Sequence, residues 1–391
     1  MTSCDMGRII IEKEDFHKKR HMRIYSGAIK KVIDAAPGDI VECYNKDGRF
    51  LCMGYYNPKS NISVRVLSFE KEKISRSFFE KRIRMANYKR LKWIKDTDAY
   101  RVVYSESDFL PGLIVDKYGD YIVIQIETLG MAKMTETIVD VLKHLFNPVC
   151  IYERSDVESR RYEGLPLVKR VLYGKEPDDK IQITENGLRF LVDIKMGQKT
   201  GFYLDQRENR HKLLEFNCER VFNLYSYTGS FGVYAAIGGA KEVINIDTSE
   251  SALEIAKENF RINNIPDSKH KEIKMNCEDF LKNMERVNDY NTLVIMDPPN
   301  YVKKIKDIED GIKKYESIHK DVFYKMEKGF LFTFCCSGLV KRSEFLKVIT
   351  DAALKMRKDV NILYFSTHPY DHPISLYVYE TEYLKGVFSC I

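Results

Sequence analysis

The sequence predicts an α/β protein in three parts: a small β barrel at residues 1–75, a middle α+β domain at 76–190, and a doubly wound, Rossmann-like sheet at 191–391. Three observations support this prediction. Short apolar segments separated by turn residues fill the first part, strand and helix patterns are mixed in the second, and strands and helices alternate in the third. A chain of 391 residues is long enough for two or three domains.

The composition is that of a globular protein, with 44% hydrophobic and 31% charged residues. No apolar run approaches the ~20 residues that a membrane-spanning helix needs, and residues 1–10 lack the layout of a signal peptide. We therefore expect a cytoplasmic protein. The nine cysteines are scattered without a C-x-x-C spacing, which argues against a zinc site and against a disulfide framework.

Positive charge is concentrated in the first quarter of the chain. Residues 1–100 contain 22 Lys and Arg against 13 Asp and Glu, whereas residues 101–391 contain 41 against 44. This distribution predicts a module that binds a polyanion, joined to a catalytic domain. A solvated, lysine-rich surface would give the same count.

The elements of the first two parts can be placed in order. The strands of the barrel are expected at residues 9–11, 40–43, 50–54 and 62–67. Residues 17–25, HKKRHMRIY, either contact phosphates and stack on a base or form a surface loop. A basic helix at 75–95 either lies against RNA or is simply solvated. The middle domain should continue with strands at 100–104, 112–115, 121–127, 151–154 and 188–194, and with a helix at 131–145.

Seven strands are expected in the third part, at residues 221–224, 243–247, 272–275, 292–296, 330–334, 361–365 and 376–379. Helical patterns at 249–263 and 307–327 lie between them. This alternation is typical of a doubly wound parallel sheet, in which ligands bind outside the carboxyl ends of the strands.

The first strand–helix–strand unit of this sheet, VFNLYSYTGSFGVYAAIGGAKEVINID at residues 221–247, has features of a nucleotide site. Gly229 and Gly232 follow its first strand, and glycines allow the backbone to approach a ligand closely. Asp247 ends its second strand, where a carboxylate can accept both ribose hydroxyls. Because G-x-G-x-x-G is absent, an ordinary unit without a ligand is the alternative.

Two later strands end in chemically useful residues. In LVIMDPPNY, Asp297 is followed by two prolines that stiffen the loop, so its carboxylate could bind the edge of a planar base. In FLFTFCCSG, the strand ends in Cys335 and Cys336. A thiolate can attack carbon 6 of a pyrimidine and so enable carbon 5 to accept a methyl group. A simple turn and two buried structural cysteines are the alternatives.

Two polar segments remain. Residues 197–210, GQKTGFYLDQRENR, could form a wall over a cofactor, or could simply connect a strand to a helix. Residues 367–373, THPYDHP, contain His368, Asp371 and His372, but no further ligands are spaced to complete a metal site with them.

Together these motifs resemble a known family, the class I S-adenosylmethionine-dependent methyltransferases that make 5-methylcytidine in large-subunit ribosomal RNA (the large subunit methyltransferase I type). The matching stretches are GQKTGFYLDQRENR, NLYSYTGSFGV, VINIDTSESALEIAKEN, VIMDPPNYV, FTFCCSGL and YLKG. RHMRIYSGAI and YYNPKSNISVRVL resemble the PUA domain of that family, whereas ESDFLPGLIVDKYGDYIV and IYERSDVESRRYEGL resemble its middle domain.

The resemblance implies S-adenosyl-L-methionine as the cofactor, large-subunit ribosomal RNA as the partner, and a set of site residues. Cys336 would be the nucleophile, since Cys335 falls where the family often has serine, and Asp297 would lie beside the cofactor and hold the cytosine edge. Glu278, or alternatively Asp279, would lie near the adenine. The remaining cofactor contacts would come from Tyr225, Ser226, Tyr227, Thr228, Gly229, Phe231, Asp247, Thr248, Ser249, Gln206 and Arg207.

Two other functions stay open at this stage. Asp297-Pro298-Pro299 also resembles a motif of enzymes that methylate an exocyclic amine of adenine or guanine, although Asn300 stands where their aromatic residue belongs. A non-enzymatic, RNA-binding assembly factor with a degenerate pocket is the other alternative.

Overall fold

The computed structural model describes residues 6–12 and 20–391. The chain divides into two compact units. The first comprises Met1–Thr184, Val192–Leu204 and Tyr370–Thr381, and the second comprises Glu185–Leu191, Asp205–Pro369 and Glu382–Ile391. Within residues 6–12 and 20–391, no helix combines the length and the apolar character needed to cross a membrane.

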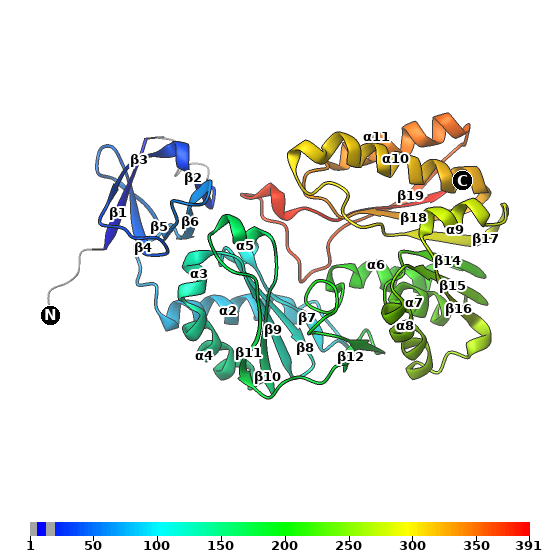
Figure 1. Ribbon diagram of the computed structural model, residues 1–391, viewed down its shortest axis with the longest axis horizontal. Helices are drawn as coiled ribbons and strands as arrows, with labels where there is room; N and C mark the ends of the chain where they lie inside the picture. Colours follow the sequence, from blue (N-terminus) through cyan, green and yellow to red (C-terminus); the bar gives the residue numbers. More distant parts are fainter. Residues whose placement is uncertain (1–5, 13–19) are drawn as a thin grey trace. The chain divides into compact units, whose positions relative to one another are not determined.

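The first unit begins with a six-stranded sheet in the order β2-β6-β5-β4-β1-β3 (Figure 1). Its pairs are antiparallel except for β1 with β4. Apolar side chains of the sheet, such as Ile9, Val41 and Val64, form a common core. The strands are β1 (Gly7–Ile11), β2 (Arg23–Tyr25), β3 (Ile29–Ile33), β4 (Ile40–Asn45), β5 (Phe50–Tyr56) and β6 (Ile62–Ser68).

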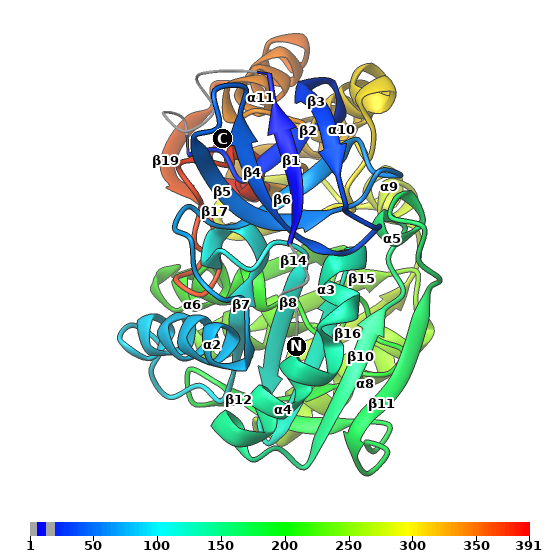
Figure 2. The same ribbon diagram turned by 90° about the vertical axis from the view of Figure 1, so that its left-hand side faces the viewer.

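A five-stranded sheet follows in the same unit, in the order β11-β10-β9-β8-β7. Apolar side chains of the helices α2, α3 and α4 form a common core with the strands of this sheet. Figure 2 shows the ribbons of these helices beside the sheet. The predicted helix at 131–145 is divided into two at Met134, which leaves the helical conformation. The elements are α2 (Arg76–Leu91), β7 (Ala99–Tyr104), β8 (Leu113–Tyr118), β9 (Tyr121–Ile126), α3 (Leu129–Lys133), α4 (Thr135–Phe146), β10 (Cys150–Ser155), α5 (Ser159–Tyr162) and β11 (Val168–Gly174). A separate two-stranded sheet follows, formed by β12 (Ile181–Glu185) and β13 (Leu188–Val192), of which Glu185–Leu191 belong to the second unit.

The second unit is built on a seven-stranded sheet in the order β16-β15-β14-β17-β18-β20-β19. Its first five strands pair in parallel, whereas β20 runs antiparallel to both of its neighbours. The strands are β14 (Arg220–Leu224), β15 (Glu242–Asp247), β16 (His270–Lys274), β17 (Val287–Met296), β18 (Met326–Cys335), β19 (Asn361–Ser366) and β20 (Lys385–Cys390). The α/β class and the doubly wound C-terminal sheet are therefore confirmed, while the division at residues 75 and 190 stays a prediction.

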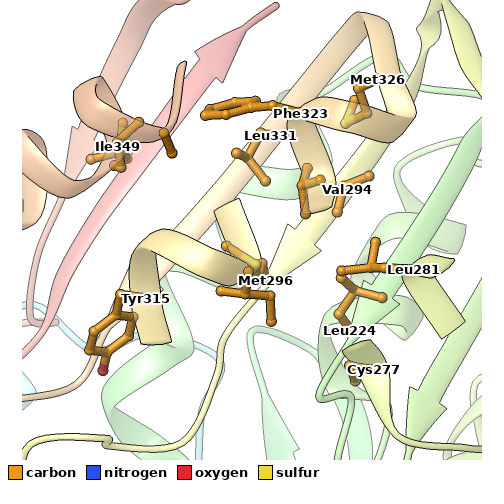
Figure 3. Close-up of a cluster of buried hydrophobic side chains, with 14 of the residues drawn as sticks. Leu224, Cys277, Leu281, Val294, Met296, Tyr315, Phe323, Met326, Leu331 and Ile349 are labelled. Atoms are coloured by element: carbon orange, nitrogen blue, oxygen red, sulfur yellow. The ribbon is translucent and has the colours of Figure 1, made fainter. Parts of the chain in front are cut away.

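Helices cover both faces of the seven-stranded sheet (Figure 1). One face carries α7 (Ser230–Ile237) and α8 (Glu250–Ile262), and the other carries α9 (Cys277–Asn283), α10 (Ile308–Lys325) and α11 (Arg342–Met356). Figure 3 shows the core beneath the second group, where Leu281, Phe323 and Ile349 of the helices pack on Val294 and Leu331 of the strands.

The order of the strands in the seven-stranded sheet indicates where a ligand would bind. The chain runs outward from β14 to β16, then continues from β17 on the other side of β14, so the carboxyl ends of β14 and β17 flank the switch point of the sheet. Leu224 pairs with Met296 at these ends. Tyr225 and Asp297 therefore follow two adjacent strands at the same edge.

The predicted strand at 376–379 is wrong. This segment forms an isolated bridge between Ser375 and Val378 and then a 3-10 turn, η7 (Tyr379–Thr381). Leu376 and Tyr379 are 77% and 76% exposed, while Val378 is buried with the core of the six-stranded sheet. This apolar and aromatic stretch thus contributes one anchoring side chain, that of Val378, and the seventh strand of the sheet is β20.

Candidate active site

The loop after β14 has an unusual backbone. Tyr225, Tyr227 and Gly229 adopt positive φ angles of 57°, 47° and 71°. Left-handed tyrosines are energetically unfavourable, and such residues cluster at functional sites. A Cβ atom at Gly229 would lie 2.8 Å from the Cβ of Ala256, so only glycine allows this approach to α8.

Two hydroxyl groups in this loop are buried without a hydrogen-bond partner among the described residues. They belong to Ser226 and Thr228, which are 7% and 2% exposed. Because an unsatisfied buried polar group is costly, such groups point to a polar ligand at the loop.

Asp247, at the end of β15, is held rigidly by the backbone. Its Oδ2 accepts a hydrogen bond from the N–H of Tyr227 at 2.8 Å, and its Oδ1 accepts one from the N–H of Ser249 at 2.9 Å. A carboxylate has about four lone-pair sites, so both oxygens keep the capacity to accept a further hydrogen bond each.

A cavity of about 210 Å³ lies against these residues. Four of the predicted cofactor residues line it, namely Tyr225, Asp247, Thr248 and Glu278. Its other lining residues, which the sequence analysis missed, are Asn276, Cys277, Pro299, Tyr301 and Lys314.

Some of these missed residues could have been identified from a pattern in the sequence, and others could not. Asn276 follows β16 and caps α9 by accepting a hydrogen bond from the N–H of Glu278 at 2.8 Å, so a search of every strand end would have found it. Tyr301 comes four residues after Asp297. Its hydroxyl forms a hydrogen bond of 3.2 Å with the hydroxyl of Tyr225, and either group can be the donor. Lys314 comes from the middle of α10, where no local pattern distinguishes it.

Other predicted cofactor residues lie outside the cavity lining. Ser249 caps α8 by accepting a hydrogen bond from the N–H of Ala252 at 3.3 Å. Asp279 is exposed and pairs with Lys282 at 2.7 Å. Phe231 is buried in α7. Of the two residues expected near the adenine, Glu278 lines the cavity and Asp279 does not.

A second cluster forms where β17 and β18 end. The Cys336 thiol lies 3.3 Å from Oδ1 of Asp297, while the side-chain amide of Gln206 donates to Oδ2 at 2.9 Å. Asn209 in turn donates to Oε1 of Gln206 at 2.6 Å. The two oxygens of this carboxylate thus have different neighbours, one a thiol and the other an amide that fixes its orientation.

The two adjacent cysteines are in different environments. Cys335, the last residue of β18, is fully buried, and this burial raises the pKa of its thiol. Cys336 follows the strand and is only partly buried. The structure therefore brings Cys336, and not Cys335, to the carboxylate of Asp297.

One further predicted cofactor residue, Arg207, and one residue of the YLKG stretch, Lys385, are both buried. Arg207, which begins α6 (Arg207–Lys212), is 1% exposed, and its Nε lies 3.3 Å from Glu208. Lys385, in the YLKG stretch, is also buried. Its ammonium donates to the carbonyl of Ser337, and burial lowers its pKa.

The remaining polar segments have structural partners. His368 accepts hydrogen bonds at Nε2 from the N–H groups of Tyr383 and Leu384, and Asp371 accepts one from the N–H of Arg101. In the part of the chain that the structure describes, no three His, Cys, Asp or Glu residues are arranged to hold a metal. Of the basic segment 17–25, residues 17–19 lie outside the described residues.

Comparison with known proteins gives matches to two family models and to several whole proteins. A family model described as S-adenosylmethionine-dependent methyltransferase matches residues 154–320, and one described as a PUA-like domain matches residues 12–69. The chain is 38% identical over 375 residues to ribosomal RNA large subunit methyltransferase I of Aeromonas salmonicida, covering 94% of this chain and 95% of that protein. It is 40% identical over 382 residues to the protein of the same name of Vibrio cholerae, covering 95% and 96%.

A solved structure has the same fold. A protein of Streptococcus mutans described as a SAM-dependent methyltransferase superimposes with a TM-score of 0.83 at 22% identity, covering 98% of this chain and all of that one.

Proposed function

The chain belongs to the ribosomal RNA large subunit methyltransferase I family and is an S-adenosylmethionine-dependent methyltransferase, and we propose that it methylates carbon 5 of a cytidine in large-subunit ribosomal RNA through a covalent cysteine adduct. The contact between Cys336 and Asp297 carries this proposal, because it places a nucleophile and a proton acceptor 3.3 Å apart. In this proposal, residues 1–75 steer the RNA and residues 191–391 perform the reaction.

The residues around the cavity fit the cofactor. When bound, S-adenosylmethionine supplies an electrophilic methyl group. Asp247 would accept the ribose hydroxyls, and the unpaired hydroxyls of Ser226 and Thr228 would find polar partners on the ligand. Glu278, which also lines the cavity, would contact the adenine.

Asp297 and Cys336 would carry the chemistry on the base. Asp297 takes the thiol proton, and the sulfur of Cys336 attacks carbon 6 of the cytosine. The electron pair of the ring double bond becomes available at carbon 5, which accepts the methyl group. A base removes the proton from carbon 5, the double bond reforms, and the carbon–sulfur bond breaks to release the thiolate. The target nucleotide would be unstacked from its neighbours to reach these groups.

The test replaces each cysteine in turn and follows methyl transfer to large-subunit RNA with a radiolabelled cofactor. We expect Cys336→Ala to abolish transfer while cofactor binding, measured by calorimetry, is retained. Cys335→Ala is the matched control, since it removes a thiol one residue away, and it should stay active.

Two further measurements separate the alternatives. RNA containing 5-fluorocytidine should remain covalently attached to the native protein, because fluorine at carbon 5 cannot leave as a proton does, and Cys336→Ala should form no such complex. Mass spectrometry of the product nucleosides should find 5-methylcytidine. A methylated exocyclic amine, or normal activity of Cys336→Ala, would contradict the proposal.

A further inference from the structure

One side of α2 in the first unit carries an aromatic and basic surface that the proposed reaction does not use. A buried ion pair holds the elements that form this surface together. Arg90, near the end of α2, is 1% exposed and donates to both carboxylate oxygens of Asp108 at 2.6 Å. This pair fixes the 3-10 turn η2 (Ser105–Asp108) against the helix.

Phe109, which follows this turn, is held in a strained conformation. Its φ angle is 58°, a left-handed value that costs an ordinary residue about 1–2 kcal/mol. With Phe78 of α2 it lines a cavity of about 210 Å³, together with the basic residues Lys81, Arg82 and Lys89. Strain of this kind in a bulky aromatic residue is typical of ligand sites.

Arg82 lines this cavity together with two acidic residues, Glu72 and Asp108. Its guanidinium lies over the rings of Phe78 and Phe109, 4.6 and 5.4 Å from their centroids. Among the described residues it makes a single ion pair, with Glu72 at 3.7 Å, and no hydrogen bond. Burial lowers its pKa from the ordinary value. Its N–H groups are therefore available to an anionic ligand.

Further aromatic and basic residues adjoin this cavity in two directions. A second cavity of about 200 Å³ shares Arg82 and Phe109 and reaches Phe69, whose ring lies under the Arg20 guanidinium at 4.7 Å. In the other direction, Lys89 leads by helical spacing to Trp93, just after the end of α2.

Trp93 and Tyr370 form a stacked pair on the surface of the first unit. Their ring centroids are 5.4 Å apart at an interplanar angle of 21°, although the residues are 64% and 59% exposed. From Arg82 to Trp93 the helical rise is about 16 Å. This distance exceeds the ~3.4 Å spacing of stacked bases several times over, so the surface has room for several nucleotides.

We propose that the surface formed by Phe78, Arg82, Lys89, Trp93, Phe109 and Tyr370 binds a short single-stranded segment of RNA, outside the site of methyl transfer. The inference rests on the proposed function in that the substrate is RNA. The exposed rings of Trp93 and Tyr370 can stack on bases, and Arg82 and Lys89 supply cations for the phosphate backbone. Phe78, which is 5% exposed, supports the Arg82 guanidinium from below. A protein partner would gain less from this surface, because the cations that accompany the rings favour a regularly spaced anion.

The test uses the fluorescence of Trp93, because the chain contains a single tryptophan. The full-length protein is titrated with an eight-nucleotide RNA of adenosine and uridine, which cannot be methylated on cytosine. We expect saturable quenching that weakens with salt. Inorganic polyphosphate, which has no bases, should not reproduce the quenching.

Substitutions of single residues of this surface, with a control on α2, test the proposal further. Arg82→Ala should weaken binding about tenfold and reduce the magnitude of the salt slope by about 0.7, the value for one phosphate contact of a single strand. Arg82→Lys should restore the slope but not the full affinity, because lysine lacks the planar guanidinium. Arg84→Ala is the matched control, since Arg84 is on the same helix, is 60% exposed and pairs with Glu80. Tyr370→Ala should weaken binding about 5- to 150-fold.

RNA binding that leaves Trp93 fluorescence unchanged, or equal effects of Arg82→Ala and Arg84→Ala, would overturn the proposal. Methylation of cytidine-containing RNA is measured in parallel. Loss of quenching with methylation intact rejects this surface alone, whereas quenching without 5-methylcytidine rejects the proposed reaction alone.

Discussion

Acid should destabilise the second unit through one buried histidine. His319 of α10 is fully buried, with Nδ1 2.6 Å from the carbonyl of Tyr315 and Nε2 3.0 Å from the hydroxyl of Thr333. A neutral ring fits these neighbours, with Nδ1–H donating to the carbonyl and the hydroxyl donating to Nε2. Burial lowers the pKa of His319 to about 4 from its ordinary value of 6.5.

The sign and size of the effect follow from this difference. Between pH 6.5 and pH 4 the unfolded chain binds a proton at His319 and the folded chain does not, so stability is present above pH 6.5 and is lost as the pH falls. One pKa unit corresponds to about 1.4 kcal/mol, which gives a loss of about 2 kcal/mol at pH 5 and about 3 kcal/mol below pH 4.

The perturbation is His319→Gln, which cannot titrate. Urea unfolding of the second unit is followed by circular dichroism at pH 7.5 and at pH 5.0. The native protein should lose about 2 kcal/mol more than the variant between these two pH values. His144→Gln, at a side chain that is 58% exposed, is the control and should behave as the native protein does. An equal loss in native protein and His319→Gln would refute the reasoning, as would an NMR titration of His319 near pH 6.5.

Three further predictions concern the site and its support. Asp297→Asn should lower kcat by about 10²- to 10⁴-fold with cofactor affinity unchanged, since a general base contributes about that much; radiolabelled methyl transfer measures it. Asp247→Ala should weaken cofactor binding about 10- to 150-fold in calorimetry, because hydrogen bonds to a charged group are lost, and activity should recover at high cofactor concentration. Glu185→Gln removes the carboxylate that lies 2.6 Å from the buried Arg210 guanidinium and should cost about 3–5 kcal/mol in thermal unfolding, whereas combining it with Arg210→Met should restore most of the loss.

The sequence predicted the second unit well where its patterns were long. The strands at 221–224 and 243–247 correspond to β14 and β15, because apolar runs between glycines and charged residues have few other conformations. The end of the chain was harder. The strand at 376–379 was expected from a short stretch of apolar and aromatic residues, yet only Val378 is buried, and the strand that completes the sheet comes at Lys385–Cys390.

The candidate site was predictable where residues follow strand ends. Asp247, Asp297 and Cys336 all do, and strand ends of a parallel sheet meet at one edge. Lys314 was not predictable, because a helix residue reaches the cavity only through the packing of α10 on the sheet. Gln206 was expected as a cofactor residue, but its hydrogen bond with Asp297 depends on tertiary folding rather than on a local pattern.

The place of β20 between β18 and β19 has a consequence for biosynthesis. Neither β18 nor β19 gains this neighbour until residues 385–390 have been translated, and the first unit likewise needs residues 370–381. Cys336 is attached directly to β18, so its strand remains an open sheet edge on the nascent chain for about fifty residues of elongation. Both units are therefore complete only once residues 370–390 have joined them, since this stretch supplies the segment of the first unit as well as β20.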